Sequence, residues 1–102
     1  MNAPHRPSAP PEAWIKSYVP QSDGEDLALR LHLFRARDHI TALLGNAVCE
    51  MGHQHLRDAH DLAGHMMFKH GASETQLKAA VDYCRALTKA AMCAEILDGA
   101  VG

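Results

Sequence analysis

The densest group of side chains that could bind a metal lies in residues 49–70, which contain five of the eight histidines of the chain. Cys49 and His53 are four residues apart, so a helix would place this thiol and imidazole one turn apart, within reach of a soft or borderline metal. His60 continues the same stripe two turns further on, about 10 Å away, too far to share one ion. A Zn or Cu site at Cys49, His53 and His60 would therefore need another ligand from elsewhere, and we expect these histidines to face solvent or to cap neighbouring groups.

Catalytic chemistry has weaker support in the sequence. Asp58, Asp61 and His65 share one helical face at steps of three and four, and a carboxylate beside an imidazole is the minimum for general base catalysis. The same pattern is common on solvated, ion-paired surfaces. The sequence has no glycine-rich phosphate loop, no nucleophile motif and no Cys-x-x-Cys pair. We expect no enzyme activity, no catalytic residue and no cofactor.

Residues 67–77 have the outline of a helix-turn-helix, with a helix, a glycine turn and a capped second helix. Thr75, Gln76 and Lys78 would be the residues that contact DNA. Glu74 would oppose a phosphate backbone, and the same outline fits any short connection between antiparallel helices. An ordinary helical hairpin is therefore the preferred interpretation, and a DNA-binding dimer is an alternative.

Four further side chains form a candidate partner-binding set: Trp14, Tyr18, Arg30 and Arg37. Large aromatic residues dominate interface energetics, so Trp14 and Tyr18 could clamp a partner, or they could hold the N-terminal segment to its own domain. Arg30 and Arg37 could contact an anionic group. Acidic residues bracket this stretch, however, and a solvated, salt-bridged helix face is the simpler interpretation.

The N-terminal segment has a composition that favours an arm. Residues 1–11 contain four prolines and, after the first methionine, no large apolar residue, so they cannot form a helix. One or two helical turns should follow, started by Pro11 and ended before Pro20. We therefore divide the chain into a Pro-rich arm with a short Trp- and Tyr-containing turn, residues 1–21, and a helical domain, residues 22–102.

Capping and periodicity predict helices across that domain. Ser22 and Glu25 have the spacing of a capping box, so a helix should begin directly after Ser22. Apolar residues then recur at steps of three and four through the histidine-rich segment. One unbroken helix over residues 23–70 would be about 70 Å long, too long for a domain of this size. Gly45 and Gly52 are both candidate breaks, and we expect the break near Gly52.

A second capping box marks the start of the last helix. Gly71 suits the left-handed residue that follows a helix, and Ser73 with Gln76 supplies the cap. We expect helices near residues 23–51, 53–69 and 74–98. No segment alternates with period two, so no sheet is expected. The predicted fold is all-α: a small three- to four-helix bundle or an assembly of helical hairpins, with an irregular Pro-rich N-terminal arm.

Composition limits the core and the partners. In a chain of 102 residues only 5% are aromatic, and alanine makes up much of the hydrophobic fraction, so the core is thin. A homo-oligomer that completes its core across an interface is the natural remedy. The net charge of −2 gives no general attraction to nucleic acid, and no stretch is apolar enough to cross a membrane.

These observations favour a non-enzymatic helical interaction module. It would act as a homo-oligomer, or as a small accessory subunit or regulator of a larger assembly. Three cysteines without paired spacing, and no apolar secretory segment, predict a cytoplasmic location. A small helix-turn-helix-like DNA-binding regulator, and a binder or sensor of Zn or Cu, remain the two alternatives.

Overall fold

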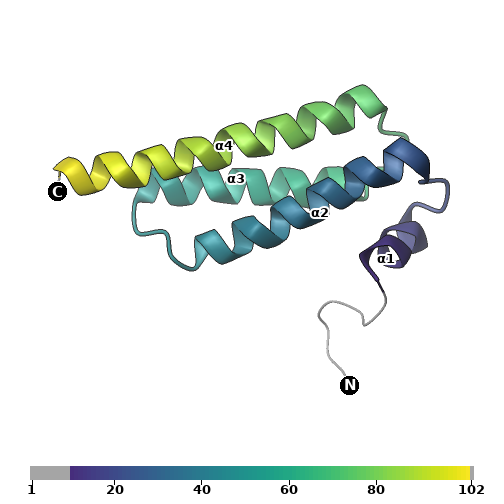
Figure 1. Cartoon of the computed structure of the whole chain (residues 1–102), viewed down its shortest axis with the longest axis horizontal. Helices are drawn as coiled ribbons and strands as arrows, with labels where there is room; N and C mark the ends of the chain where they lie inside the picture. Colours follow the sequence, from purple (N-terminus) through teal and green to yellow (C-terminus); the bar gives the residue numbers. More distant parts are fainter. Residues whose placement is uncertain (1–9, 102) are drawn as a thin grey trace, which may run out of the picture.

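The computed structural model describes residues 10–101, which form four helices and no strand. These helices are α1 (Pro11–Tyr18), α2 (Gly24–Leu44), α3 (Glu50–Met67) and α4 (Glu74–Val101). The three long helices alternate in direction and pack together, and α1 packs against α2 (Figure 1). The prediction of an all-α helical bundle is therefore confirmed. Most of the predicted Pro-rich arm, residues 1–9, lies outside the described residues.

The three long helices form a thin layer. The described part of the chain is flat, with principal extents of 49 × 38 × 15 Å. α3 is the central helix and packs against both neighbours, while α2 and α4 run in the same direction on either side of it (Figure 1). One side of the gap between α2 and α4 is therefore covered by α3, and the other side is left open.

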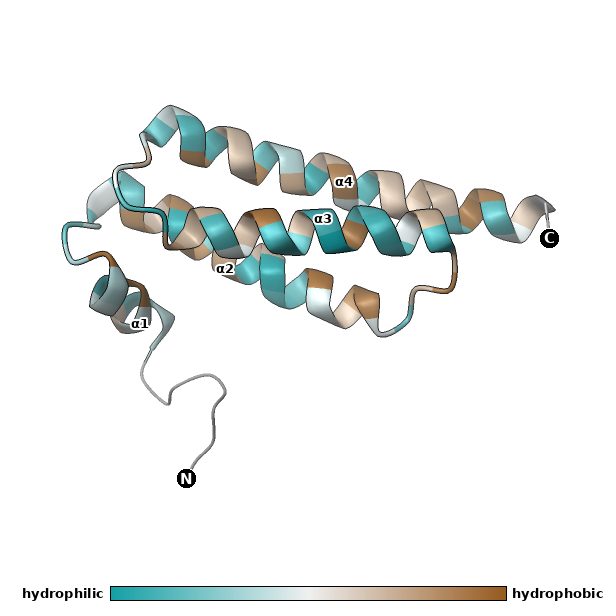
Figure 2. Ribbon diagram, turned by 180° about the vertical axis from the view of Figure 1, so that it is seen from behind, coloured by the Kyte–Doolittle hydropathy of each residue, from teal (hydrophilic) through white to brown (hydrophobic). Residues whose placement is uncertain are grey.

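A single core joins all four helices. Apolar residues recur along the helices between polar ones, as an amphipathic helix requires (Figure 2). The fully buried apolar side chains are Ile15, Leu33, Ile40, Ala59, Ala63, Met67, Leu77 and Cys84. Two of the eight are alanines, and each alanine contributes less than the roughly 1.5–3 kcal/mol that burial of a large aliphatic side chain gives.

The short helix α1 begins at Pro11 and ends before Pro20, as predicted. Its Trp14 ring meets Phe34 of α2 and Phe68 edge-on, with ring centroids 5.6 and 5.2 Å apart. Ile15 is completely buried in the common core. The helical part of the predicted arm is thus packed on the bundle, and the proposed boundary at residue 21 stays a prediction.

The break between the first two long helices lies at residues 45–49, so the expected break near Gly52 is wrong. Gly52 lies inside α3 and is buried. A Cβ atom there would come within 3.1 Å of the Ala91 carbonyl oxygen and 2.9 Å of Glu95 Oε2. The absence of a side chain lets α3 and α4 approach closely, which offsets the cost of about 1 kcal/mol for glycine within a helix.

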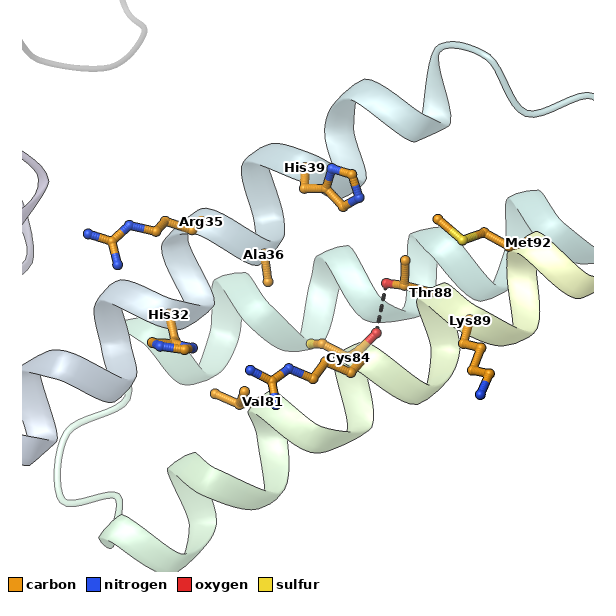
Figure 3. Close-up of a pocket in the computed structure, with 10 residues that line it drawn as sticks. His32, Arg35, Ala36, His39, Val81, Cys84, Thr88, Lys89 and Met92 are labelled. Atoms are coloured by element: carbon orange, nitrogen blue, oxygen red, sulfur yellow. Dashed lines mark hydrogen bonds between the residues drawn. The ribbon is translucent and has the colours of Figure 1, made fainter.

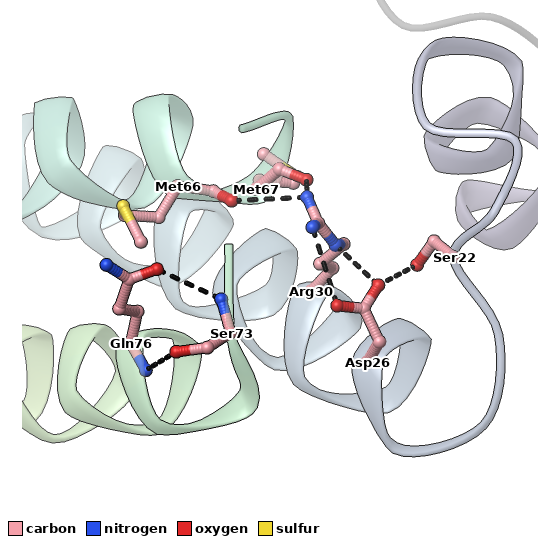
Figure 4. A network of polar contacts seen from close by, with 7 residues as sticks. All are labelled: Ser22, Asp26, Arg30, Met66, Met67, Ser73 and Gln76. Atoms are coloured by element: carbon pink, nitrogen blue, oxygen red, sulfur yellow. Dashed lines mark hydrogen bonds and ion pairs between the residues drawn. The ribbon is translucent and has the colours of Figure 1, made fainter. Parts of the chain in front are cut away.

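The two predicted capping boxes have different outcomes. Ser73 Oγ accepts from the Gln76 amide at 3.1 Å, and Gln76 Oε1 accepts from the Ser73 amide at 3.0 Å, so the second box is confirmed (Figure 4). The first box is wrong. α2 starts one residue later, after Asp23, and Ser22 is buried, where its hydroxyl donates to Asp26 Oδ2 at 2.6 Å.

That hydroxyl belongs to a buried polar network that closes the C-terminal end of α3 (Figure 4). Arg30, only 1% exposed, pairs through Nε with Asp26 Oδ2 at 2.8 Å and donates through Nη1 to the Met67 carbonyl oxygen at 3.0 Å. Burial by itself raises the pKa of Asp26. Hydrogen bonds from Arg30 and Ser22, together with the charge of Arg30, outweigh that effect and lower it.

The N-terminal end of α3 is closed by the other neighbouring helix. Glu95 of α4 accepts from the Cys49 amide at 2.8 Å and from the Val48 amide at 3.4 Å. A carboxylate at the start of a helix and a guanidinium at its end both complement the helix dipole. The central helix is therefore fixed in place by one charged residue from each neighbour.

Candidate partner-binding groove

A hollow with a volume of about 470 Å³ lies between α2 and α4 on the open side of the layer (Figure 3). Its walls come from two helices that run in the same direction. Residues of α2 and residues of α4 that are three or four apart fall on one face of each helix, so both helices turn a matching strip toward the groove. The groove is thus a product of the bundle geometry and not of a loop.

The rim of the groove is cationic. Five of the ten lining residues are basic: His32, Arg35, His39, Arg85 and Lys89. None of the ten carries a carboxylate. Although the whole chain has a net charge of −2, the lining of this hollow carries the positive charges of Arg35, Arg85 and Lys89 and no negative charge.

The side chains at the base of the groove are either apolar or already hydrogen-bonded within the bundle. Ala36, Val81, Cys84, Thr88 and Met92 line it. Cys84 donates to the Ala59 carbonyl oxygen at 3.5 Å, and burial raises the pKa of its thiol, so it stays protonated. Thr88 donates to the Cys84 carbonyl oxygen at 2.8 Å. The polar atoms of these two side chains are already used within the bundle, which leaves an apolar base for a ligand.

A second, smaller hollow of about 110 Å³ continues the groove toward the C-terminal ends of α2 and α4. The two hollows share Met92. Apart from Asn46 and Glu95, the second one is lined by apolar residues: Leu43, Ala47, Leu56, Ala91 and Met92. From His32 to the end of α2 at Leu44 the combined groove follows the helix for about 18 Å, and Asn46 and Ala47, just after the helix, lengthen it to about 21 Å.

The candidate partner-binding residues from the sequence lie elsewhere. Trp14 is half-buried between aromatic rings, whereas Tyr18 is 56% exposed and contacts Phe68. Arg30 is buried, and its donors close α3, as described above. Arg37 Nε lies 3.4 Å from His60 Nε2. The structure does not bring these four residues together in one surface.

The candidate metal ligands are only partly brought together. Cys49 and His53 are one turn apart, as expected, and the backbone amide of His53 donates to the Cys49 carbonyl at 2.9 Å. Cys49 is buried, and both ring nitrogens of His60 already have neighbours, Arg37 and Asp61. Within residues 10–101 no three His, Cys, Asp or Glu side chains form a group that could hold a metal ion.

The candidate DNA-contacting residues lie in the first turn of α4. Gln76 uses its side chain in the cap with Ser73, and Thr75 and Lys78 are exposed beside Glu74. Lys78 is therefore the only cation of this predicted set. The turn before it contains Gly71 with φ +76°, the left-handed conformation that the sequence predicted.

Sequence reasoning singled out Arg30 and Arg37 on α2 and missed Arg85 and Lys89 on α4. The missed pair is four residues apart, and Met92 follows three residues later on the same face. This spacing was visible in the sequence. What it could not show is that this face of α4 lies opposite His32 and His39 of α2, because that depends on the helix packing.

Comparison of this chain with protein-family models, with curated proteins and with solved structures gives no match. In the part of the chain that the structure describes, every helix is too short or too polar to span a membrane.

Proposed function

We propose that this chain is a non-enzymatic helical interaction module, and that the groove between α2 and α4 receives a helix from a protein partner. The observation that carries the proposal is an apolar groove with a cationic rim that is open to solvent along two helices of the same direction. The partner helix would be amphipathic, with an apolar stripe toward the base and carboxylates toward the rim. Charge complementarity with Arg35, Arg85 and Lys89 of the lining selects such a partner.

The dimensions of the groove favour a helix as the occupant. A groove about 21 Å long accommodates about 14 helical residues, which is enough for apolar anchors at steps of three, four and seven. A helix placed there would pack against α2 and α4 from the side opposite α3. Four helices around one core form the most common compact arrangement for helices of this length, and the added helix would complete it.

The experiment uses a synthetic amphipathic peptide of about 14 residues, with leucines on one face and glutamates beside them. We expect its binding to shift the backbone amide resonances of Ala36, Val81 and Met92. Ala36→Trp would fill the base of the groove and abolish binding. Ala13→Trp, at an exposed position of α1, is the matched control and should leave binding unchanged. Binding that survives Ala36→Trp, or shifts only residues outside the groove, would contradict the proposal.

Self-association is supported by a different surface, the outer face of α4. Six residues recur there at alternating steps of four and three, and all are exposed or half-exposed: Ala79, Tyr83, Ala86, Ala90, Cys93 and Leu97. This spacing is the repeat of a two-stranded coiled coil, so a second copy of α4 is the matching partner. The seam is about 27 Å long and about 10 Å wide, well below the roughly 800 Å² per partner of stable interfaces. The dimer should therefore be weak.

Sedimentation over a range of protein concentrations tests this dimer. Ala86→Glu places a charge in the middle of the seam and should shift the equilibrium to monomer, because a charge buried at an interface without a partner is costly. Ala28→Glu, an equally exposed position on α2, controls for the added charge. Equal dissociation constants for the two variants would exclude α4 as the dimer contact.

Because all three cysteines are free, we assign the protein to the reducing cytoplasm.

A further inference from the structure

The groove differs between its two ends, and this difference sets the direction of the helix that it binds. The inference rests on the proposed function. All five basic lining residues belong to the first hollow, which is the end of the groove nearer the N-terminal ends of α2 and α4. The other half is apolar, with Leu43, Ala47 and Ala91, and ends beside Glu95.

We infer that the bound helix runs antiparallel to α2 and α4, with its carboxylates in its C-terminal half. In this direction its acidic side chains meet Arg35, Arg85 and Lys89, and its apolar N-terminal half covers the second hollow. The negative end of its dipole also lies toward the cations, which is the favourable arrangement. The opposite direction would place the negative end beside the Glu95 carboxylate and leave the cations facing the positive end.

The central helix of the bundle already displays the same arrangement. α3 runs antiparallel to α2 and α4 (Figure 1), with the Glu95 carboxylate at its N-terminal end and the Arg30 guanidinium at its C-terminal end. A helix in the groove would lie parallel to α3 on the open side of the layer. Both helices would thus be oriented by an acidic residue at one end and by basic residues at the other.

Direction can be measured with two peptides of identical composition, each about 14 residues long. One carries three glutamates in its last two turns and the other carries them in its first two turns, and both have the same leucine face. Each peptide is cross-linked into a helix, because glutamates near an N-terminus stabilise a free helix and would otherwise favour the second peptide. We expect the peptide with C-terminal glutamates to bind about tenfold more tightly, because the other peptide must either give up the ion pairs or reverse its direction and place the negative end of its dipole beside Glu95.

Charge reversal at one groove residue assigns the effect. Arg85→Glu should remove most of the difference between the two peptides, whereas Arg57→Glu, at an exposed position of α3 outside the groove, should preserve it. A spin label at the N-terminus of the tighter peptide should broaden the resonances of Ala47 and not those of His32. Equal binding of both peptides that is still abolished by Ala36→Trp would overturn the inferred direction and leave the proposed function standing. If neither peptide bound the groove of the wild-type protein, both the inferred direction and the proposed function would be contradicted.

Discussion

Arg30 and Glu95 hold opposite ends of the same helix, although they belong to different helices on either side of it. The Arg30 guanidinium donates to the Met67 carbonyl at 3.0 Å, and the Glu95 carboxylate accepts from the Cys49 amide at 2.8 Å. Neither contact is local: their partners are 37 and 46 residues away in the sequence. The position of α3 along its axis is therefore set by tertiary contacts and not by its own capping residues.

Loss of the Asp26 carboxylate should destabilise the fold strongly. Asp26→Asn leaves the Arg30 guanidinium, whose side chain is 2% exposed, without its counter-charge. Breaking a buried ion pair from one side costs about 3–5 kcal/mol, and because Asp26 is 26% exposed we expect about 2–3 kcal/mol. Urea denaturation at pH 7 measures this. A variant as stable as the wild type would show that the pair contributes nothing net.

The same carboxylate predicts a pH dependence of stability. The pKa of Asp26 is lower in the folded protein than in the unfolded chain, where it is about 3.9. The ionised form therefore favours folding, so its contribution is complete above about pH 5 and is lost as the pH falls through the folded-state pKa. The stability gap between wild type and Asp26→Asn should shrink below pH 4. A gap that stays constant between pH 6 and pH 3 would contradict the assignment.

A methyl group at Gly52 should destabilise the protein although it favours helix formation. Its Cβ would lie 3.1 Å from the Ala91 carbonyl oxygen, a backbone atom, so α3 and α4 must move apart. We expect Gly52→Ala to cost about 1–2 kcal/mol after a helix-propensity gain of about 1 kcal/mol. Gly64→Ala is the control, because its Cβ would meet only the Arg37 side chain at ordinary distances, from 3.8 Å. Thermal melting should show opposite signs for the two variants.

The predictions that were confirmed rest on signals within one or two helical turns. Pro11, Gly71 and the Ser73 box each determine a helix end through their own backbone or side chain. The same local logic failed at Gly52, because a glycine required for helix contact and a glycine that ends a helix look alike in a sequence. It failed again at Ser22, whose hydroxyl donates to the Asp26 carboxylate of a buried ion pair and does not cap α2.

The groove between α2 and α4 could not be predicted from short sequence patterns, for a related reason. Arg85 and Lys89 look like ordinary solvent-facing residues of an amphipathic helix. Their face of α4 becomes one wall of a hollow only because α2 and α4 pack on either side of α3. Arg30 shows the converse: a cation in a polar sequence context lies in the core, where main-chain carbonyls and one carboxylate accept its hydrogen bonds.

The Glu95 cap predicts a graded response to substitution. Glu95→Ala removes both acceptors at the start of α3 and should cost about 1–2 kcal/mol, whereas Glu95→Gln retains one acceptor and should cost less. Glu50→Gln, in the exposed first turn of α3, should have little effect. Chemical denaturation ranks the three variants. If Glu95→Gln and Glu95→Ala were equally destabilising, charge and not hydrogen bonding would be the main contribution.

The three cysteines should differ in reactivity. Cys93 is exposed on the outer face of α4, whereas Cys49 and Cys84 are buried. Burial also raises the pKa of Cys84, which reduces its thiolate fraction further. A short pulse of iodoacetamide at pH 8, read by peptide mass spectrometry, should label Cys93 first and Cys84 only after unfolding. Rapid labelling of Cys84 in the folded protein would show that the groove base opens readily.

Because a side chain of α4 caps α3 from 46 residues away, the amide of Cys49, the residue directly before α3, reports on a helix to which it does not belong. Exchange of the Cys49 amide with deuterium requires the Glu95 carboxylate to move off it, either by rotation of its side chain or by movement of the C-terminal turns of α4 away from α3. A residue near one loop thus becomes a probe of the far end of the chain. A ligand that clamps α4 onto the bundle would slow that exchange without touching Cys49.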